Sequence, residues 1–497
     1  MNNQDLYTFL RSIGTCQHCC LRYLQGKGSE YLNVFASLKK KEVTLEDVPT
    51  PEDDPKKFKE NPCVACLGLF QSKIIDEITE ALKTHPDLPK YDCPTVSAAF
   101  SFPIILQLRQ LILWVTLLKR FPGEFKQDEP PDIPIKDCFR AIVNQKLVEV
   151  LKKPLDPNAN GILVTFEFNF ENELEILTKL TLVNPKYFKD RSQMSKKFKK
   201  EFLTRNAFEQ NFIPAKINLV RFKEQYPVPP EIPSYTLEMT SVKVNGPIVF
   251  VAGRYCKFSR RLSQSPWVLD GKKVMEDSVQ QYITEQIYEF FQVPENTIIF
   301  SSSGREDVDV RCLDDGRPFI LEIPDAKKAD IPFEIARKME NEVNKCGKIS
   351  IKDLQVVTRE STALLRHGEE DKKKVYRALC ALKVPVTDEI LQKLTLPEGF
   401  TINQTTPIRV LHRRPLLVRP RRIYCMRASR TSVSDKALVL EVTTQAGTYV
   451  KELVHSDFGR SHPSCKSLIG EEIDLVALDV MAIDLDWPPK IDYSTNS

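Results

Sequence analysis

The sequence predicts an α+β protein, because helical and strand patterns mix along its 497 residues without an internal repeat. Asp277–Gln292 places Val279, Ile283 and Ile287 on one side of an amphipathic helix. Ile162–Phe170 alternates apolar and polar side chains, which is typical of a half-buried strand. A chain of this length can form two or three domains with real cores.

Composition indicates a soluble globular chain, with 42% hydrophobic and 28% charged residues. The most apolar stretch, Ala98–Lys119, is interrupted by Pro103 and Arg109, so we expect a buried helix there and no membrane span. The N-terminus lacks the basic and apolar regions of a signal peptide. Thirteen cysteines without that signal favour reduced thiols or metal ligands over disulfides.

Three domains are expected in chain order. Residues 1–70 hold two cysteine pairs, and residues 71–264 form an accessory domain that begins with helices over 71–120. Glu124–Pro134 is a polar, proline-rich linker. The pattern changes at about 265, so the last domain is expected to span residues 265–497.

The cysteine pairs predict a structural metal site. Two C-x-x-C units lie 43 residues apart and comprise Cys16, Cys19, Cys63 and Cys66. Four thiolates close a tetrahedral site and leave no open position, which favours structural zinc over catalytic zinc. A redox pair or ordinary core cysteines are the alternatives, and Cys20 and His18 are lower-ranked substitute ligands.

Basic residues are concentrated in two segments, although the net charge is only +4. Lys186–Arg205 carries a local charge of +6, and Thr401–Arg430 carries eight arginines and no carboxylate. Such one-sided segments favour contact with nucleic-acid phosphates. Two solvated faces, or a nuclear-targeting run at Lys196–Lys200, are the alternatives.

A cluster of charges surrounds Asp307 in the stretch SSSGREDVDVR, Ser301–Arg311. Apolar runs flank this stretch, so it is predicted to be a loop at a sheet edge. A carboxylate placed there can act as nucleophile or general base if a cation keeps it ionised. Lys451 and Tyr376 are candidate partners further along the chain, whereas Asp307 by itself would be read as a solvated loop acid.

Here the chain resembles the THUMP-containing tRNA pseudouridine synthases that act in the TΨC arm. The family motif G-R-x-D matches Gly304–Asp307, and G-T-Y-[IV]-K-E matches Gly447–Glu452. Gly253–Arg260 and Leu411–Pro415 match as well, and the likeness extends from about residue 250 to the C-terminus. The resemblance implies a C-terminal synthase domain with a mixed, largely antiparallel sheet flanked by helices. It also implies an N-terminal zinc-binding, THUMP-containing α/β accessory domain.

The resemblance also implies roles for individual residues. Asp307 would be the catalytic aspartate, Lys451 its basic partner, and Tyr376 the tyrosine that packs against the target base. Asp309 and Glu306 would be structural, or partners of Arg311. The expected substrate contacts are Arg305, Arg254, Val450, Leu453, Arg413 and Arg414.

The implied activity is isomerisation of uridine to pseudouridine at position 54, 55 or both. This reaction loses no atom and changes no oxidation state, and neither GxxxxGK[ST] nor GxGxxG occurs, so no organic cofactor is expected. We expect a monomeric isomerase that binds tRNA, contains structural zinc, does not associate with membranes, and resides in the nucleus, the cytoplasm or both.

The competing class is a non-catalytic RNA-binding or scaffold protein with the same fold. A decayed enzyme is expected to lose at least one of Asp307, Tyr376 and Lys451, and all three are present. Two departures from the family pattern, at Cys256 and His455–Ser461, are expected near RNA-contacting loops.

Overall fold

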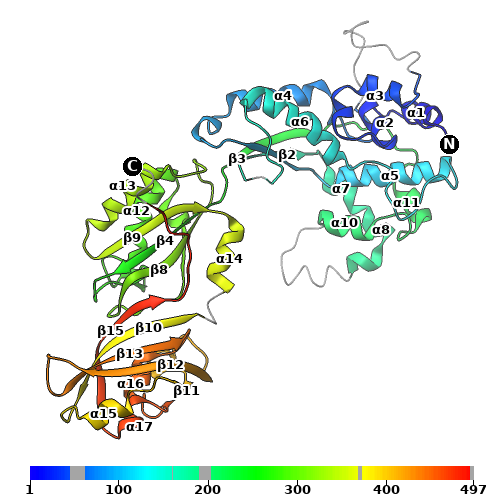
Figure 1. The fold of residues 1–497 in the computed structure, drawn as a ribbon. Helices are drawn as coiled ribbons and strands as arrows, with labels where there is room; N and C mark the ends of the chain where they lie inside the picture. The colour runs from blue at the N-terminus through cyan, green and yellow to red at the C-terminus, as the bar shows by residue number, and fades with distance from the viewer. Residues whose placement is uncertain (45–61, 159, 190–202, 368–371, 493–497) are drawn as a thin grey trace. The chain divides into compact units, whose positions relative to one another are not determined.

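The structure, a computed structural model, describes residues 1–44, 62–158, 160–189, 203–367 and 372–492. The chain divides into two compact units, Met1–Asn245 and Gly246–Ser497 (Figure 1). Each unit contains a sheet with helices, which confirms the α+β class. The division lies before the expected boundary at 264/265, because β4 (Val249–Lys257) pairs on both sides with strands of the second unit.

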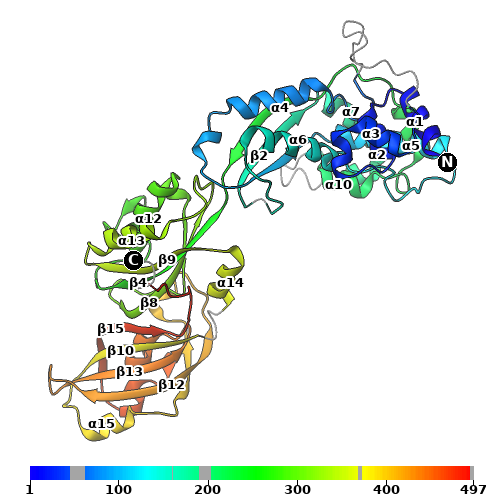
Figure 2. The ribbon, with the colours of Figure 1, turned by 45° about the horizontal axis from the view of Figure 1, so that its top comes forward.

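A three-stranded sheet forms the centre of the first unit. β1 (Val96–Ser101) runs parallel to β2 (Ile162–Asn169), and β2 runs antiparallel to β3 (Glu238–Asn245). Figure 2 shows α4 and α6 along this sheet. The β2 strand confirms the prediction from alternation, whereas the prediction of helices throughout 71–120 is wrong at β1.

Aromatic packing joins helix and sheet in this unit. Phe139 of α6 lies 5.2 Å from Phe100 of β1 and 5.8 Å from Phe168 of β2, between ring centroids. Contacts of this kind favour edge-to-face rings in a closely packed core. The apolar stretch around 98–119 contributes the largely buried α5, and no helix in the described ranges is long and apolar enough to cross a membrane.

Helices make up the other described elements of the first unit, and the two longest are α5 and α6. They are α1 (Asn3–Ser12), α2 (Gln17–Tyr23), η1 (Gly28–Leu32), α3 (Val34–Lys40), α4 (Ser72–Thr84), η2 (Leu88–Lys90), α5 (Ile105–Arg120), α6 (Ile135–Leu151), α7 (Glu173–Thr178), α8 (Leu180–Val183), α10 (Arg205–Asn211) and α11 (Leu219–Gln225). Of the basic stretch 186–205, residues 190–202 lie outside the described residues.

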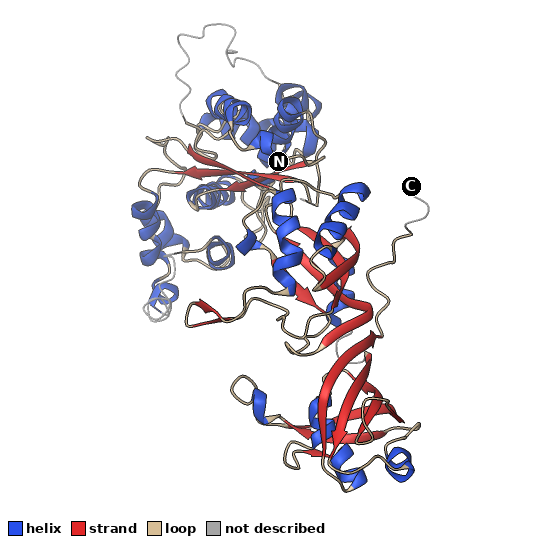
Figure 3. Ribbon diagram, turned by 90° about the vertical axis from the view of Figure 1, so that its left-hand side faces the viewer, coloured by secondary structure: helices blue, strands red, loops and turns tan. Residues whose placement is uncertain are grey.

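The second unit is built on one large sheet (Figure 3). Its order is β14-β11-β12-β13-β10-β15-β8-β4-β9, with β7 also paired to β8. The pair β8–β15 is parallel and the other described pairs are antiparallel, so the expected mixed, largely antiparallel sheet is confirmed. The strands not yet bounded are β7 (Ile299–Ser302), β8 (Arg311–Ile323), β9 (Ile349–Val357), β10 (Lys373–Leu382), β11 (Phe400–Thr405), β12 (Val418–Arg430), β13 (Ala437–Gln445), β14 (Ser461–His462) and β15 (Ile473–Ile483).

Two large apolar cores form on this sheet, and a smaller cluster comprises Phe250, Ala252, Ile320, Leu365 and Trp487. Helices α12 (Val279–Phe291) and α13 (Phe333–Asn344) contribute to the core with β4, β8 and β9. Helices α15 (Asp388–Lys393), α16 (Val450–His455) and α17 (Cys465–Ile469) contribute to the core with β10, β12, β13 and β15. The helix predicted at 277–292 is α12, which Ser278 caps by accepting the N–H of Gln281.

The remaining described elements of this unit are small. They are β5 (Val268–Leu269), β6 (Lys272–Lys273), η3 (Glu295–Thr297), α14 (Arg359–His367) and η4 (Ile408–Val410). The segment that contains Asp307 joins β7 to β8, and β8 pairs with β15 and contributes residues to both large cores.

Candidate functional site

Asp307 lies on the loop Ser303–Val310. Buried polar contacts fix this loop on its core side. Gly304 has φ +89°, and a Cβ there would lie 3.0 Å from Nη1 of Arg317, so a side chain would be strained and crowded. Glu306 points into the protein, where Nε of Arg317 lies 2.9 Å away and the Tyr255 hydroxyl donates to it. The chain direction therefore turns Glu306 inward and leaves Asp307 half-exposed.

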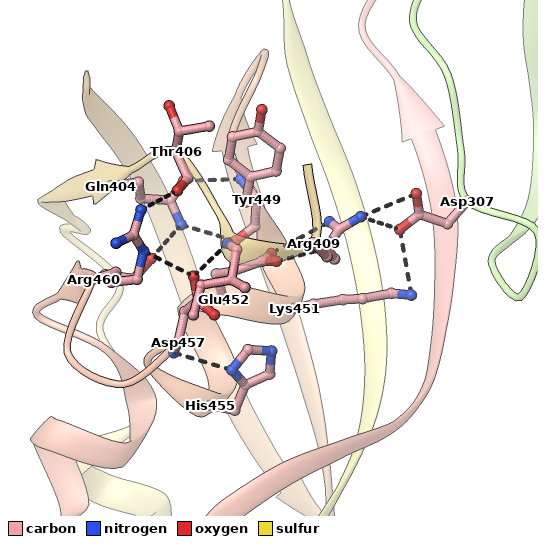
Figure 4. Close-up of polar contacts among 12 residues, drawn as sticks. Asp307, Gln404, Thr406, Arg409, Tyr449, Lys451, Glu452, His455, Asp457 and Arg460 are labelled. Carbon is pink, nitrogen blue, oxygen red and sulfur yellow. Dashed lines mark hydrogen bonds and ion pairs between the residues drawn. The ribbon is translucent and has the colours of Figure 1, made fainter. Parts of the chain in front are cut away.

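Two cations contact the Asp307 carboxylate (Figure 4). Nη1 of Arg409 donates to Oδ1 at 3.2 Å and to Oδ2 at 3.0 Å. Nζ of Lys451 lies 3.3 Å from Oδ2 of Asp307 but donates to both oxygens of Asp309 at 2.8 Å. The expected contact of Lys451 with Asp307 is present, and Arg409 makes the hydrogen bonds.

Arg409 is itself fixed by a buried carboxylate. Its Nε donates to Oε1 of Glu452 at 2.6 Å, and Glu452 is 1% exposed. Although burial opposes it, the hydrogen bond and charge of Glu452 raise the pKa of Arg409. The backbone N–H of Ile408 donates to Oδ2 of Asp457 at 3.2 Å, which anchors the η4 turn that carries Arg409. The contacts run from Glu452 through Arg409 to Asp307 (Figure 4).

Asp307 and Glu306 form part of the lining of a cavity of about 1000 Å³. Its basic lining residues are Arg305, Arg317, Lys372, Lys374, Arg409, Arg413, Arg414, Arg419, Arg421 and Lys451, and its acidic ones are Glu306 and Asp307. So strong an excess of cations attracts a polyanion. The arginine-rich segment singled out in the sequence thus contributes directly to this cavity.

The cavity brings together most of the predicted site residues. Tyr376 on β10 and Val450 on α16 line it with Asp307 and Lys451. Arg305, Arg413 and Arg414 line it as well and are exposed. These positions are compatible with the expected roles, which stay predictions.

Two predicted substrate contacts lie elsewhere. Leu453 of α16 is fully buried in the apolar core that α16 forms with β10, β12, β13 and β15. Arg254 is 2% exposed, and its guanidinium donates to the carbonyl oxygens of Asp315, Gly316, Leu485 and Trp487. Neither side chain lines the cavity, so we do not retain them as substrate contacts.

The pKa shifts favour a protonated Tyr376 and an ionised Asp309. Burial raises the pKa of Tyr376 to about 12, so its phenol is neutral at physiological pH. Burial would raise the pKa of Asp309, but the hydrogen bond and charge of Lys451 lower it. Lys451 thus faces two carboxylates, one of which it binds more closely.

Sequence reasoning missed Arg409 as the partner of Asp307. It was one of eight arginines in Thr401–Arg430, and nothing in its local pattern separated it from the others. The available signal was Glu452, a carboxylate that follows Lys451 in the motif and needs a cation when buried. The proposed pairing of Arg311 with Asp309 or Glu306 is wrong, because Arg311 binds Asp479 at 2.9 and 2.6 Å.

The two departures from the family pattern have structural positions. Cys256 is 9% exposed on β4, where its thiol lies 3.5 Å from the carbonyl oxygen of Asp314. In the stretch His455–Ser461, Asp457 anchors the turn of Arg409, whereas Phe458 is 94% exposed. The second departure therefore lies next to the cavity residues.

The four predicted cysteines converge in the first unit. The sulfur atoms of Cys16, Cys19, Cys63 and Cys66 all lie within 4.8 Å of one another. A tetrahedral site with metal–sulfur bonds of about 2.3 Å has sulfur–sulfur edges of about 3.8 Å, and Cys16 and Cys66 are separated by 3.8 Å. His18 instead stacks on Phe70, with ring centroids 5.1 Å apart.

Donors around the sulfur atoms fit a negatively charged metal thiolate cluster. The backbone N–H groups of Cys16 and Ala65 donate to Sγ of Cys63 at 3.1 and 3.4 Å. Nη1 of Arg22 donates to Sγ of Cys19 at 3.5 Å. Such outer contacts orient thiolate ligands and offset their charge. The cysteines can therefore hold a metal ion.

Comparison with known proteins gives the same picture. The family model described as Pus10, C-terminal matches residues 250–484, and that described as Eukaryotic Pus10, N-terminal matches residues 63–244. The putative tRNA pseudouridine synthase Pus10 of Drosophila melanogaster is 42% identical over 99% of each chain. The tRNA pseudouridine synthases Pus10 of Xenopus laevis and Homo sapiens are each 34% identical, covering 97% and 87% of this chain and 97% and 80% of their own.

These matches and the site define an enzyme of the pseudouridine synthase class. The chain belongs to the Pus10 family. A solved Cbf5-Nop10-Gar1 complex contains a chain that is 16% identical, with a TM-score of 0.26 over 46% of this chain and 48% of that one. That likeness is too low to support an argument about the site.

Proposed function

We propose that this enzyme converts uridine to pseudouridine in the TΨC arm of tRNA, at position 54, 55 or both, with Asp307 as the catalytic carboxylate. The names of the relatives support tRNA as the substrate. The motif resemblance supports the TΨC arm and the aspartate. The observation that carries the proposal is the Asp307 carboxylate, ion-paired to Arg409 in a cavity whose charged lining residues are mostly cations.

The cavity residues suit the steps of the isomerisation. The N1–C1′ bond breaks, the uracil turns over, C5 bonds to C1′, C5 loses its proton, and N1 gains one. Arg409 holds the Asp307 carboxylate in place for attack or proton removal. Exposed Arg305 is placed to fill the space left by a nucleotide removed from its stack. Tyr376 offers a neutral ring on which uracil can stack.

The first unit supports a role in RNA binding and metal binding. We assign Zn²⁺ to the four cysteines because a closed tetrathiolate set suits a structural zinc ion. The motif resemblance supports a THUMP-containing accessory region here, and residues 186–189 begin a basic stretch suited to RNA phosphates. We further propose that the protein is a monomer and resides in the nucleus, the cytoplasm or both.

Tritium release from [5-³H]uridine-labelled tRNA transcripts tests the proposal. The wild-type protein should release tritium, and Asp307→Asn should not, because C5 loses its proton only when pseudouridine forms. Asp309→Asn is the matched control, since it removes a neighbouring loop carboxylate that binds Lys451. Variants with U54 or U55 replaced by cytidine identify the position.

Equal release by wild type and Asp307→Asn would refute the assigned aspartate. Release from other RNAs but not from tRNA would refute the substrate. Tight tRNA binding without tritium release from any RNA would favour the competing hypothesis of a non-catalytic RNA-binding protein.

A further inference from the structure

A buried lysine lies directly behind the loop that carries Asp307. Lys257, the last residue of β4, has no exposed surface. Its Nζ donates to the carbonyl oxygens of Leu262 at 2.7 Å, Asp307 at 3.0 Å and Val308 at 2.9 Å. An ammonium group has three N–H donors, so all of them are used on backbone oxygens.

No carboxylate is hydrogen-bonded to this ammonium group in the described part of the chain. Burial lowers the pKa of Lys257, while the charges of Glu306 and Asp309 oppose that shift. Burying an ammonium group without a directly bound carboxylate is costly, and a core residue of similar size would avoid that cost. The structural contribution of the buried Lys257 ammonium group is therefore its three hydrogen bonds to backbone carbonyl oxygens.

Neighbours of Lys257 hold the same loop in the same way. Gln264 donates to the carbonyl oxygen of Gly304 at 3.0 Å, and Arg260 donates to that of Asp309 at 3.0 Å. The segment 257–264 thus runs along the loop and binds its backbone at several points. Among these contacts, the bond from Lys257 reaches the carbonyl group of Asp307 itself.

We propose that Lys257 is a positioning residue for catalysis, which fixes the two consecutive peptide groups that follow Asp307 and so aims the Asp307 carboxylate. The inference rests on the proposed catalytic role of Asp307. Arg409 and Lys451 restrain the carboxylate from the cavity side, and Lys257 restrains its backbone from the core side. A displacement of about 1 Å at a reacting group can lower a rate about 100-fold.

Lys257→Met tests the proposal, because methionine keeps a long side chain and loses all three donors. We expect the single-turnover rate of tritium release at saturating tRNA to fall about 10- to 100-fold. The Kd for tRNA should change less than about twofold, since Lys257 has no exposed surface. Hydrogen exchange of amides in 303–310 should become about tenfold faster, with β13 unchanged.

Glu340→Met is the matched control for lost stability in the same unit. Glu340 is 1% exposed on α13, where its carboxylate accepts the backbone N–H of Leu354 at 2.8 Å and binds Arg337. This variant should lower the melting temperature without lowering the rate of the bound complex. If Lys257→Met does not fold, Lys257→Gln, which keeps two N–H donors, should fold with an intermediate rate.

The outcomes separate this inference from the proposed function. Wild-type activity that is lost in Asp307→Asn but retained within twofold in folded Lys257→Met would overturn the role of Lys257 alone. Slow exchange at 303–310 in that variant would overturn it as well. Activity retained in Asp307→Asn would instead overturn the catalytic assignment of the aspartate.

Discussion

Nη1 of Arg409 donates to both carboxylate oxygens of Asp307, at 3.2 and 3.0 Å, although 102 residues separate them. The same guanidinium binds buried Glu452 through Nε at 2.6 Å. Glu452 thus fixes the guanidinium of Arg409, and that guanidinium binds the carboxylate of Asp307. Arg409 therefore orients the carboxylate to which we assign the proposed chemistry.

Arg409→Leu should lower both stability and rate. It leaves Glu452 buried without its cation, which should cost about 3 kcal/mol of unfolding free energy. The single-turnover rate should fall about 100-fold because Asp307 loses its positioning contact. Urea unfolding and tritium release measure the two effects. The exposed pair Arg377–Glu441 gives the control, and Arg377→Leu should cost less than about 1 kcal/mol.

The double variant Arg409→Leu/Glu452→Leu separates these two effects. Removing both charges should restore most of the lost unfolding free energy, because no buried carboxylate is left unpaired. The rate should stay low. A rate that recovers together with stability would contradict a direct role of Arg409 at Asp307.

Arg413→Ala and Arg414→Ala should weaken tRNA binding through lost phosphate contacts. Both side chains are exposed in the cavity lining. Each variant should reduce the slope of log K against log salt by about 1, with the rate of the bound complex unchanged. Fluorescence anisotropy at several salt concentrations measures the slope. Arg427→Ala, which changes an exposed β12 arginine outside the lining, should leave it unaltered.

Asp479→Asn should destabilise the second unit in a pH-dependent manner. Burial would raise the pKa of Asp479, but Arg311 and Arg260 lower it. A carboxyl whose pKa is lower when folded stabilises the fold above its unfolded value of about 3.9. The unfolding free energy of the wild type should therefore be about 1–3 kcal/mol higher than that of Asp479→Asn at pH 7. The difference should shrink as the pH falls from about 4 through the folded pKa.

Urea unfolding from pH 7 to pH 3 measures this difference. Asp474→Asn on the same strand is the control, because Asp474 is exposed and its carboxylate accepts the adjacent backbone N–H of Leu475. The unfolding free energy of Asp474→Asn should differ little from that of the wild type at pH 7 or at pH 3. A difference for Asp479→Asn that stays constant down to pH 3 would contradict the ion-pair assignment.

Metal removal should affect the first unit specifically. We expect one Zn²⁺ per chain by elemental analysis, lost in Cys63→Ser and retained in Cys20→Ala, whose thiol is buried outside the four-cysteine group. Treatment with a chelator should lower the unfolding temperature, because structural zinc contributes folding free energy. Full zinc content in Cys63→Ser, or its loss in Cys20→Ala, would show that the ligands are misassigned.

Local patterns predicted the elements whose side chains repeat with a clear period. Alternation along Ile162–Phe170 gave β2, and the apolar stripe of Asp277–Gln292 gave α12. The short strand Val96–Ser101 was missed because six residues with mixed burial show no period among flanking helices. The unit boundary was missed because β4 belongs to the second unit only through pairing with strands much later in the chain.

The sequence by itself determined which chemical groups the protein possesses: the Asp307 motif, Tyr376, Lys451 and the two cysteine pairs. The cysteine spacing was sufficient because two such pairs supply a closed tetrathiolate site, and the motif resemblance singled out Asp307, Tyr376 and Lys451. Only the tertiary structure decided that Arg409 reaches Asp307 and that Lys257 binds its backbone. Ion pairs and hydrogen bonds depend on distances of a few ångström, which the packing of remote strands and turns sets.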